Sequence, residues 1–294
     1  MARKFSLIAA AIVTLTLSGA SSLCMAQIVG PATAPTTAPA AATKPAITPE
    51  QRAFNEAARN TPPDKPFPKE IDTRPLLPDG SPNPNVGKVS GSFKNYHETF
   101  LKRRAQPMSV LFIGDSITQG WSGAGAAVWK ERYTKLDAAN FGISGDKTQH
   151  VLWRIDNGEL DGIEPKVVVL MIGTNNAGDT APAIASGVIA IAKKINEKLP
   201  KSKLLLLGVF PRSPSATGPD GKPTPVRAKL MEVNAELAKL HDGKQTFYLE
   251  IWKQFLAEDG SITKEMMGDA LHPGPKGYQV WADAMQPTLD ELFK

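Results

Sequence analysis

From residue 93 onward the sequence predicts an α/β domain of three layers, with a mostly five-stranded parallel sheet between two layers of helices. Short, almost continuous apolar runs recur along this part of the chain, as in Ser109-Val-Leu-Phe-Ile-Gly114. Such runs are typical of parallel strands, which are buried on both faces. Amphipathic segments with helical spacing separate the runs, and this alternation is the pattern of a doubly wound sheet.

The expected elements follow one another in chain order. Phe93, Tyr96 and Phe100 share one face of a first helix, which covers 93–106. The expected strands cover 109–114, 138–142, 167–173, 204–210 and 246–250. The helices expected between and after them cover 126–136, 147–155, 183–199, 227–241 and 276–293. The resulting domain, residues 93–294, is long enough for one three-layer core.

The N-terminus is predicted to be an export signal that ends at residue 26. Arg3 and Lys4 precede an apolar run from Phe5 to Leu17, and the small residues that lead to Ala26 offer a cleavage point. The run is shorter than the ~20 residues that a membrane-spanning helix needs, so it suits a signal peptide. We therefore expect a periplasmic or extracellular protein. No transmembrane span is expected, because no long uncharged apolar run follows.

Cys24 is the only cysteine, and cleavage after Ala26 would remove it. The mature chain would then have no thiol for a disulfide, for cysteine catalysis or for a thiolate metal site. A lipoprotein, in which Cys24 is kept and lipidated, is the alternative. Leu23 argues against it, because it stands where that signal requires a small residue.

Two segments separate the expected signal, residues 1–26, from the domain. Residues 27–50 consist almost entirely of Pro, Ala and Thr, which predicts an extended spacer. Residues 51–92 are expected to form a loop-rich extension, in which 51–60 can make a short helix and 61–91 is dense in Pro, Gly and Asp. The net charge of +5 is small and the charges are scattered, so nucleic acid is not an expected partner.

The first polar motif comes directly after the strand at 109–114. In Gly114-Asp115-Ser116, a serine at a strand-to-helix turn would present its hydroxyl at the edge of the sheet where ligands bind. The same residues are equally compatible with a simpler role, in which Asp115 or Ser116 only caps the next helix.

Two further motifs follow neighbouring strands. The glycines in 140–146 let the backbone approach a bound group, and a glycine N–H can donate to an oxyanion. An ordinary turn would explain these glycines as well. After the strand at 167–173, Asn175 offers a neutral amide donor of the kind that stabilises charge on a carbonyl oxygen. A turn cap is the alternative for Asn175.

The fourth motif is Asp-Ala-Leu-His-Pro at 269–273, in a polar loop before the last helix. Serine is a poor nucleophile without a base, and an imidazole base needs a carboxylate to set its tautomer. Asp269 can fold back onto His272 within one short loop. The remaining histidines lie on or at the ends of expected helices and are interpreted as packing or helix-end residues: His97, His150 and His241.

In this order, the segments 114–118, 140–160, 173–176 and 269–273 resemble the SGNH (GDSL-type) hydrolase superfamily. Within it they are most similar to the alpha-subunit type of platelet-activating-factor acetylhydrolase. The likeness covers residues 93–293. The resemblance implies the flavodoxin-like fold of that superfamily. It also implies serine ester hydrolysis that needs no metal and no cofactor.

The resemblance further implies the roles of the site residues. Ser116 would be the nucleophile, His272 the general acid and base, and Asp269 the partner that orients His272. The Ser116 N–H, the Gly145 N–H and the Asn175 side chain would form the oxyanion hole.

Two residues depart from the family pattern. Asn176 stands where the wider superfamily often has Asp, although the acetylhydrolase-like branch also has Asn there. Ser144 replaces a glycine that is typical of that branch. The Asn176 departure leaves the implied activity intact, and Ser144 is a small change that can alter how its loop approaches a substrate.

The expected reaction is a two-step acyl transfer on short-chain esters. Ile117, Thr174 and Leu271 flank the expected catalytic residues and would crowd an acyl pocket, which favours acetyl groups. Export behind a spacer suits an O-acetylated carbohydrate as substrate, whereas the resemblance suggests a phospholipid-type acetylhydrolase. A lysophospholipase or lipase and a non-catalytic glycan-binding module are further alternatives. Related proteins often dimerise, but no heptad or exposed stripe in this sequence decides for or against a homodimer.

Overall fold

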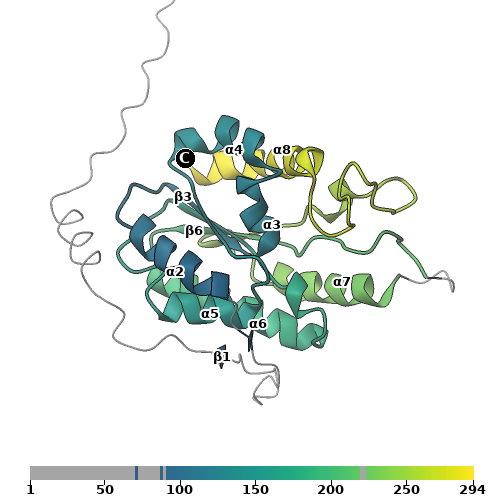
Figure 1. The fold of residues 1–294 in the computed structure, drawn as a ribbon, viewed down its shortest axis with the longest axis horizontal. Helices are drawn as coiled ribbons and strands as arrows, with labels where there is room; N and C mark the ends of the chain where they lie inside the picture. Colours follow the sequence, from purple (N-terminus) through teal and green to yellow (C-terminus); the bar gives the residue numbers. More distant parts are fainter. Residues whose placement is uncertain (1–69, 72–86, 89–90, 219–222) are drawn as a thin grey trace, which may run out of the picture. The chain divides into compact units, whose positions relative to one another are not determined.

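The computed structural model describes residues 70–71, 87–88, 91–218 and 223–294 (Figure 1). The expected signal peptide, the spacer and the short helix at 51–60 lie outside the described residues. Within the loop-rich extension, Glu70–Ile71 (β1) and Gly87–Lys88 (β2) pair as two short antiparallel strands. No helix in the described ranges combines the length and the apolar character that crossing a membrane requires.

The central sheet has five strands, all parallel, in the order β4-β3-β5-β6-β7. This confirms the predicted fold, and the order is that of the flavodoxin-like doubly wound sheets. Because the chain winds outward in both directions from β3, the switch point of the sheet lies where β3 pairs with β5. The strands are Val110–Gly114 (β3), Ala139–Gly142 (β4), Val167–Met171 (β5), Lys203–Leu207 (β6) and Thr246–Leu249 (β7).

Helices cover both faces of the sheet (Figure 1). On one side lie Gly91–Arg103 (α2), Thr148–Asp156 (α5), Ala181–Lys198 (α6) and Pro225–Ala238 (α7). On the other side lie Ala126–Arg132 (α4) and Pro275–Leu292 (α8), while the short helix Ser116–Gln119 (α3) follows β3 directly. Short 3-10 turns occupy Gly120–Ser122 (η1), Thr134–Leu136 (η2), Thr174–Asn176 (η3) and Trp252–Phe255 (η4).

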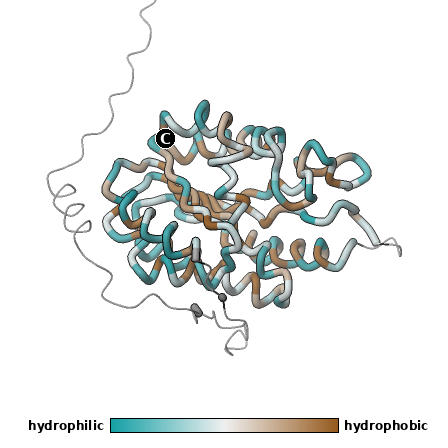
Figure 2. Tube along the Cα trace, viewed as in Figure 1, coloured by the Kyte–Doolittle hydropathy of each residue, from teal (hydrophilic) through white to brown (hydrophobic). Residues whose placement is uncertain are grey.

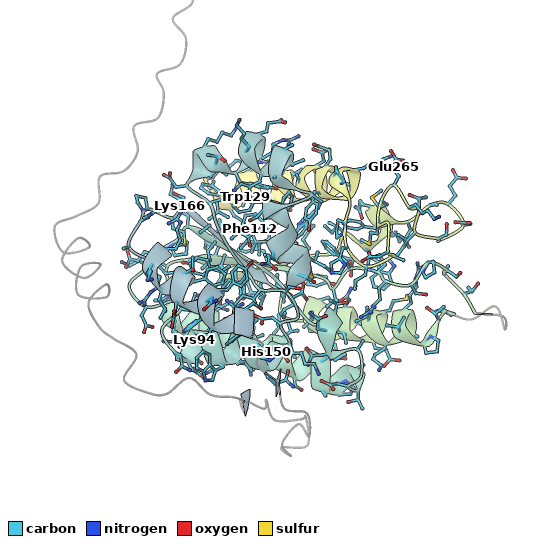
Figure 3. The ribbon with its side chains drawn as sticks, viewed as in Figure 1. Lys94, Phe112, Trp129, His150, Lys166 and Glu265 are labelled. Atoms are coloured by element: carbon cyan, nitrogen blue, oxygen red, sulfur yellow. The ribbon has the colours of Figure 1, made fainter. Side chains whose placement is uncertain are left out.

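Alternate strand residues enter different cores, as the period of two in a strand requires. Leu111 and Ile113 belong to the apolar cluster under α2, α5, α6 and α7, whereas Val110 and Phe112 belong to the cluster under α4 and α8. In Figure 2 the apolar colour is concentrated along the strands of the sheet. In Figure 3, Phe112 lies beside Trp129 of α4, and their ring centroids are 5.0 Å apart. Both faces of the sheet are therefore packed against helices.

Several predicted elements end earlier in the structure than expected, among them the first helix at Arg103, the helix expected at 227–241 at Ala238, and the three that follow. The helix expected at 126–136 ends at Arg132 and continues as the separate turn η2. The strand expected at 167–173 ends at Met171, and Gly173, with φ 130°, lies just before η3. The strand expected at 204–210 ends at Leu207, although Val209 and Phe210 stay buried. Apolar character alone predicted burial in this last case and could not predict where strand pairing stops.

Candidate active site

Ser116 is the first residue of α3 and is separated from the end of β3 by Asp115 alone. The turn before it is tight: a Cβ on Gly114 would lie 2.2 Å from the Thr118 Oγ1 and 2.3 Å from the Met171 carbonyl oxygen. Asp115 caps α3, because its Oδ1 accepts the Ile117 N–H at 2.9 Å. The capping alternative therefore holds for Asp115, which leaves the half-buried hydroxyl of Ser116 available for another partner.

The loop before α8 supplies that partner. The Ser116 Oγ lies 2.9 Å from the His272 Nε2, although the two residues are 156 positions apart in the sequence. The other ring nitrogen, Nδ1, lies 2.6 Å from the Asp269 Oδ2. The Asp269 Oδ1 accepts the backbone N–H groups of Leu271 at 3.0 Å and His272 at 2.8 Å. Between them Ala270 has φ 56°, a strained value for a non-glycine residue that turns the loop back on itself.

The charge on Asp269 determines which ring nitrogen of His272 carries the proton. Partial burial by itself would raise the pKa of the Asp269 carboxyl, but hydrogen bonds from the His272 ring and from the His272 and Leu271 N–H groups outweigh it and lower the pKa to about 2. An ionised carboxylate only accepts hydrogen bonds, so the Nδ1 must donate to it. The Nε2 of a neutral His272 is then an acceptor, and the Ser116 hydroxyl donates to it.

Asp115 carries a buried carboxyl next to this chain of contacts. The side chain is fully buried, and burial raises its pKa to about 7, although the Ile117 N–H and the nearby His272 act in the opposite direction. Its Oδ2 has no hydrogen-bond partner among the described residues. A neutral carboxyl at this position costs less to bury than a charged one.

The expected oxyanion donors come together from two other strand ends. Gly145 lies in the exposed loop after β4 with φ 83°, a conformation that favours glycine. The Asn175 side chain, in η3 after β5, does not cap its own turn but donates from its Nδ2 to the Asp146 carbonyl at 2.9 Å. A side-chain amide has two N–H groups, so the second one remains for a substrate atom. The hydrogen bond joins the Asn175 turn to the residue that follows Gly145.

Sequence reasoning did not identify the hydrogen bonds of the next residue, Asn176. It is fully buried, accepts the Thr148 N–H at 3.0 Å, and donates to the Gln149 Oε1 at 3.0 Å and the Asp179 Oδ2 at 2.9 Å. An amide can both donate and accept here, which a carboxylate could not do without protonation. Asn176 therefore ties the start of α5 to η3, on which Asn175 lies.

Two arginines form hydrogen bonds to the loops around the site. Sequence reasoning did not identify them, because their partners are distant in sequence. Arg212 donates to the Thr174 carbonyl at 3.0 Å. The buried Arg227 donates to the carbonyls of Arg212 at 3.1 Å and Ser213 at 2.8 Å. Ser213 in turn donates its N–H to the Ala270 carbonyl at 3.1 Å. This hydrogen bond connects the loop that contains Arg212 and Ser213 to the loop that carries His272.

The three expected acyl-pocket residues differ in exposure. Ile117 is 1% exposed and packs in the apolar cluster under α8, and Thr174 is also 1% exposed. Leu271 is half-buried and packs against the edge of the same cluster. Of the three, Leu271 alone therefore has a side chain that a substrate could contact without displacing core packing.

The other three histidines have structural contacts. His97 is buried between the rings of Phe93 and Trp153. His150, labelled in Figure 3, accepts the Lys147 N–H on its Nδ1 at 2.9 Å at the start of α5. The Nδ1 of His241 accepts the Tyr248 N–H at 3.1 Å. In the part of the chain that the structure describes, no three His, Cys, Asp or Glu side chains are arranged to hold a metal ion.

Comparison with known proteins places this geometry in a family. Residues 112–280 match the GDSL-like lipase/acylhydrolase family. The alpha1 subunit of platelet-activating factor acetylhydrolase IB from Homo sapiens is 38% identical over 205 residues, which is 69% of this chain and 85% of the relative.

Two solved structures share the fold. A GDSL-like lipase from Bacteroides thetaiotaomicron superposes with a TM-score of 0.54 at 20% identity, covering 68% of this chain and 98% of that one. An acetyl xylan esterase superposes with a TM-score of 0.50 at 22% identity, covering 61% and 95%. With the sequence relatives, these results establish that the chain belongs to the GDSL-like lipase/acylhydrolase family and is a hydrolase that acts on esters.

Proposed function

We propose that this protein hydrolyses acetyl and other short-chain esters through a covalent acyl-enzyme, with an O-acetylated carbohydrate as its substrate. Ser116 Oγ attacks the ester carbonyl carbon while the His272 Nε2 takes the hydroxyl proton. The tetrahedral intermediate then collapses, the carbon–oxygen bond to the alcohol breaks, and His272 returns the proton to the leaving oxygen. A water molecule releases the acyl group by the same steps, with His272 first accepting the proton of the water.

The observation that carries this proposal is the continuous pair of contacts from Ser116 through His272 to Asp269, at 2.9 and 2.6 Å. Each member meets a chemical requirement: the hydroxyl donates to the free ring nitrogen, and the ionised carboxylate stabilises the imidazolium that forms. The Ser116 N–H, the Gly145 N–H and the Asn175 amide are proposed as the oxyanion donors. Asn175 is oriented by the Asp146 carbonyl before substrate binds, as preorganised stabilisation requires.

Two considerations support a carbohydrate ester. The sequence of residues 1–50 has the composition of an export signal followed by a spacer, which would place the domain outside the cytoplasm, where polysaccharides are found. The acetyl xylan esterase with this fold demonstrates that the architecture can serve an acetylated sugar polymer. The competing candidate is an acetylhydrolase of the platelet-activating-factor type, which the 38% identity to the human subunit favours.

The nucleophile is tested by Ser116→Ala together with an active-site label. The variant should lose several orders of magnitude in turnover of p-nitrophenyl acetate. A serine-directed phosphonate should modify Ser116 in the unchanged protein, as peptide mass spectrometry would show. Modification of a different serine, or near-normal turnover by Ser116→Ala, would remove Ser116 from the mechanism.

The substrate is tested by measuring acetate release from acetylated xylan and from platelet-activating factor on one enzyme preparation. Higher kcat/KM on the xylan is the expected result. Preference for platelet-activating factor would select the competing candidate, and hydrolysis of long-chain lysophospholipids would select a lipase. Binding of xylan without any ester hydrolysis would indicate a non-catalytic module.

Export is tested by N-terminal sequencing of the protein recovered after expression in a bacterium with its full leader. The proposal expects a mature chain that starts at Gln27. A lipid-modified N-terminus at Cys24 would instead show that the protein is a lipoprotein, and an intact Met1 in the cytoplasm would contradict export.

A further inference from the structure

A cluster of charged side chains lies buried beneath the proposed site, and the mechanism above assigns it no role. Arg154 on α5 and Glu159 are both 0% exposed, and Asp146 is 1% exposed. The Arg154 Nη1 binds both carboxylate oxygens of Glu159, and its Nη2 lies 3.0 Å from the Asp146 Oδ2. Burial raises the pKa of the Asp146 carboxyl to about 8 against the pull of Arg154, as expected where two carboxyl groups share one guanidinium.

Burying such a cluster is unfavourable unless the geometry is good, and buried ion pairs often add little to stability. Apolar side chains could fill the same volume. A stabilising role therefore does not explain Arg154 well, and its contacts with the surrounding backbone are the better guide to what it does.

Those contacts connect the guanidinium to the segments that carry the proposed oxyanion donors. The Arg154 Nη2 approaches the Gly114 carbonyl at 3.5 Å, two residues before Ser116. The same carbonyl accepts the Ile143 N–H at 3.2 Å, at the start of the loop that contains Gly145.

Asp146 provides the second connection. Its side chain faces Arg154, its N–H donates to the Ile143 carbonyl at 3.1 Å, and its own carbonyl accepts the Asn175 amide at 2.9 Å. A shift of Asp146 would consequently displace Gly145 and Asn175 together.

The guanidinium is itself held in place from the other side. The ring of Phe100 lies 5.7 Å from the Arg154 Cζ, and Phe100 stacks on Phe141 of β4 with centroids 4.4 Å apart. Glu159 is approached by the His97 Nδ1 at 3.7 Å. With its plane fixed by a ring and by a carboxylate, Arg154 can direct its Nη2 at the Asp146 carboxyl and the Gly114 carbonyl. The ammonium of lysine has no planar fork that could bind Glu159 with one nitrogen and these two groups with another.

We propose that Arg154 is a positioning residue that holds Asp146, and through it Gly145 and Asn175, in the geometry of the oxyanion hole. This inference rests on the proposed function of those donors. Arg154 does not touch the substrate and acts through the Asp146 carbonyl and the loop after β4. Preorganised donors lose much of their effect when they are displaced by about 1 Å, which can cost about 100-fold in rate.

The test is Arg154→Lys, which keeps the charge but loses the planar fork. We expect kcat for p-nitrophenyl acetate to fall about 10- to 100-fold while KM changes little, because the donors act on the transition state. The matched control is Arg104→Lys. Arg104 is also buried and donates to the Gly158 and Asp161 carbonyls, so its replacement should affect thermal stability and leave kcat unchanged.

A double variant separates positioning from general loosening of the fold. If Arg154 acts through Asn175, Arg154→Lys should cost clearly less in kcat when Asn175→Ala is already present. A loss of the same factor in both backgrounds, an unchanged kcat in folded Arg154→Lys, or a change confined to KM would overturn the proposal.

If Arg154→Lys does not fold, Asp146→Asn tests whether the contact between Arg154 and Asp146 positions the oxyanion donors. It preserves the backbone carbonyl and the side-chain shape but replaces the carboxyl group that faces Arg154 by an amide, which cannot ionise. Measured above about pH 8, where the wild-type carboxyl is charged, it should show the same kcat loss and the same dependence on Asn175. An unchanged kcat in Asp146→Asn would overturn the proposal. The proposed function fails by a different result, namely full activity of Asn175→Ala or of Ser116→Ala, which needs no Arg154 variant.

Discussion

The side-chain amide of Asn175 and the backbone carbonyl of Asp146 are 2.9 Å apart and join two loops that are 29 residues apart in sequence. One loop follows β4 and the other follows β5, and these strands flank β3, which leads to Ser116. The contact fixes the orientation of an amide whose second N–H is unused by this bond. It is therefore the most direct place to test whether the site stabilises an oxyanion.

Asn175→Ala is expected to lower kcat by about 10²–10³ with little change in KM, because the lost donor acts on the transition state. The melting temperature and kcat should be measured on the same preparation. Asn157→Ala is the matched control, since within the described part of the chain its amide donates to the nearby Trp153 carbonyl at 2.8 Å, at the end of α5 and not in the proposed site. A variant that loses stability but keeps full kcat would instead identify Asn175 as a turn cap.

Asp269→Asn is expected to lower kcat by about 10³–10⁴ through a change of tautomer. Its amide oxygen can still accept the Leu271 and His272 N–H groups, so the loop should keep its shape. Its NH₂ group would face the His272 Nδ1 and make that nitrogen an acceptor. The proton then moves to Nε2, which can no longer accept from Ser116.

Asp259→Asn is the control for this change, because Asp259 accepts the Ser261 N–H in a similar surface turn at 2.9 Å, and it should keep full activity. If Asp269→Asn retains more than a tenth of the wild-type kcat, the proposed role of Asp269 in fixing the tautomer of His272 is wrong.

Asp115→Asn is expected to change how stability depends on pH. Burial raises the pKa of Asp115 to about 7, whereas an unfolded carboxyl titrates near about 3.9. Between these values the folded protein holds a proton that the unfolded chain has released. The stability that this proton contributes is fully present below about pH 4 and is lost as the pH rises through about 7.

The amide of Asp115→Asn cannot ionise, so the free energy of unfolding of the variant should rise relative to wild type between about pH 4 and pH 8. Urea unfolding at several pH values measures this difference, and subtraction of the wild-type curve removes the contribution of other buried acids such as Asp146. Parallel curves for the two proteins would mean that Asp115 is ionised in the fold throughout this range.

The proposed acyl pocket, in which Leu271 is the residue exposed enough to meet a substrate, predicts acetyl esters as far better substrates than butyryl esters, with negligible activity on octanoyl esters. A methylene forced into a filled space costs about 1–3 kcal/mol, or about 10- to 200-fold in kcat/KM. Leu271→Ala should relax this preference, because Leu271 is half-buried at the edge of the apolar cluster.

Ile117→Ala provides an informative comparison for acyl length. Ile117 is 1% exposed, so its truncation should lower the free energy of unfolding by about 2–5 kcal/mol through a core cavity, in addition to any effect on specificity. A wild-type enzyme that cleaves octanoyl esters as fast as acetyl esters would refute the crowded pocket.

The fold was predictable because its signals are local. A strand buried on both faces must be apolar along its whole length, and the runs at 109–114 and 167–173 met that condition, whereas Thr246–Leu249 is only partly buried and gave a weaker signal. The ends of elements were less predictable, as at Gly173, because a turn depends on backbone angles that residue type only partly restricts.

The sequence by itself determined the parallel sheet and the pairing of Asp269 with His272, because each depends on neighbours a few residues away. The family resemblance implied that Ser116 works with His272, but only the tertiary structure shows their contact across 156 positions and shows Arg154 beneath the loop that follows β4. From the sequence, an arginine on a helix with apolar neighbours is expected to be exposed, whereas Arg154 is 0% exposed in the packed fold. The reason is physical: local pattern specifies which face of an element is buried, whereas the meeting of distant side chains depends on how all the elements pack together.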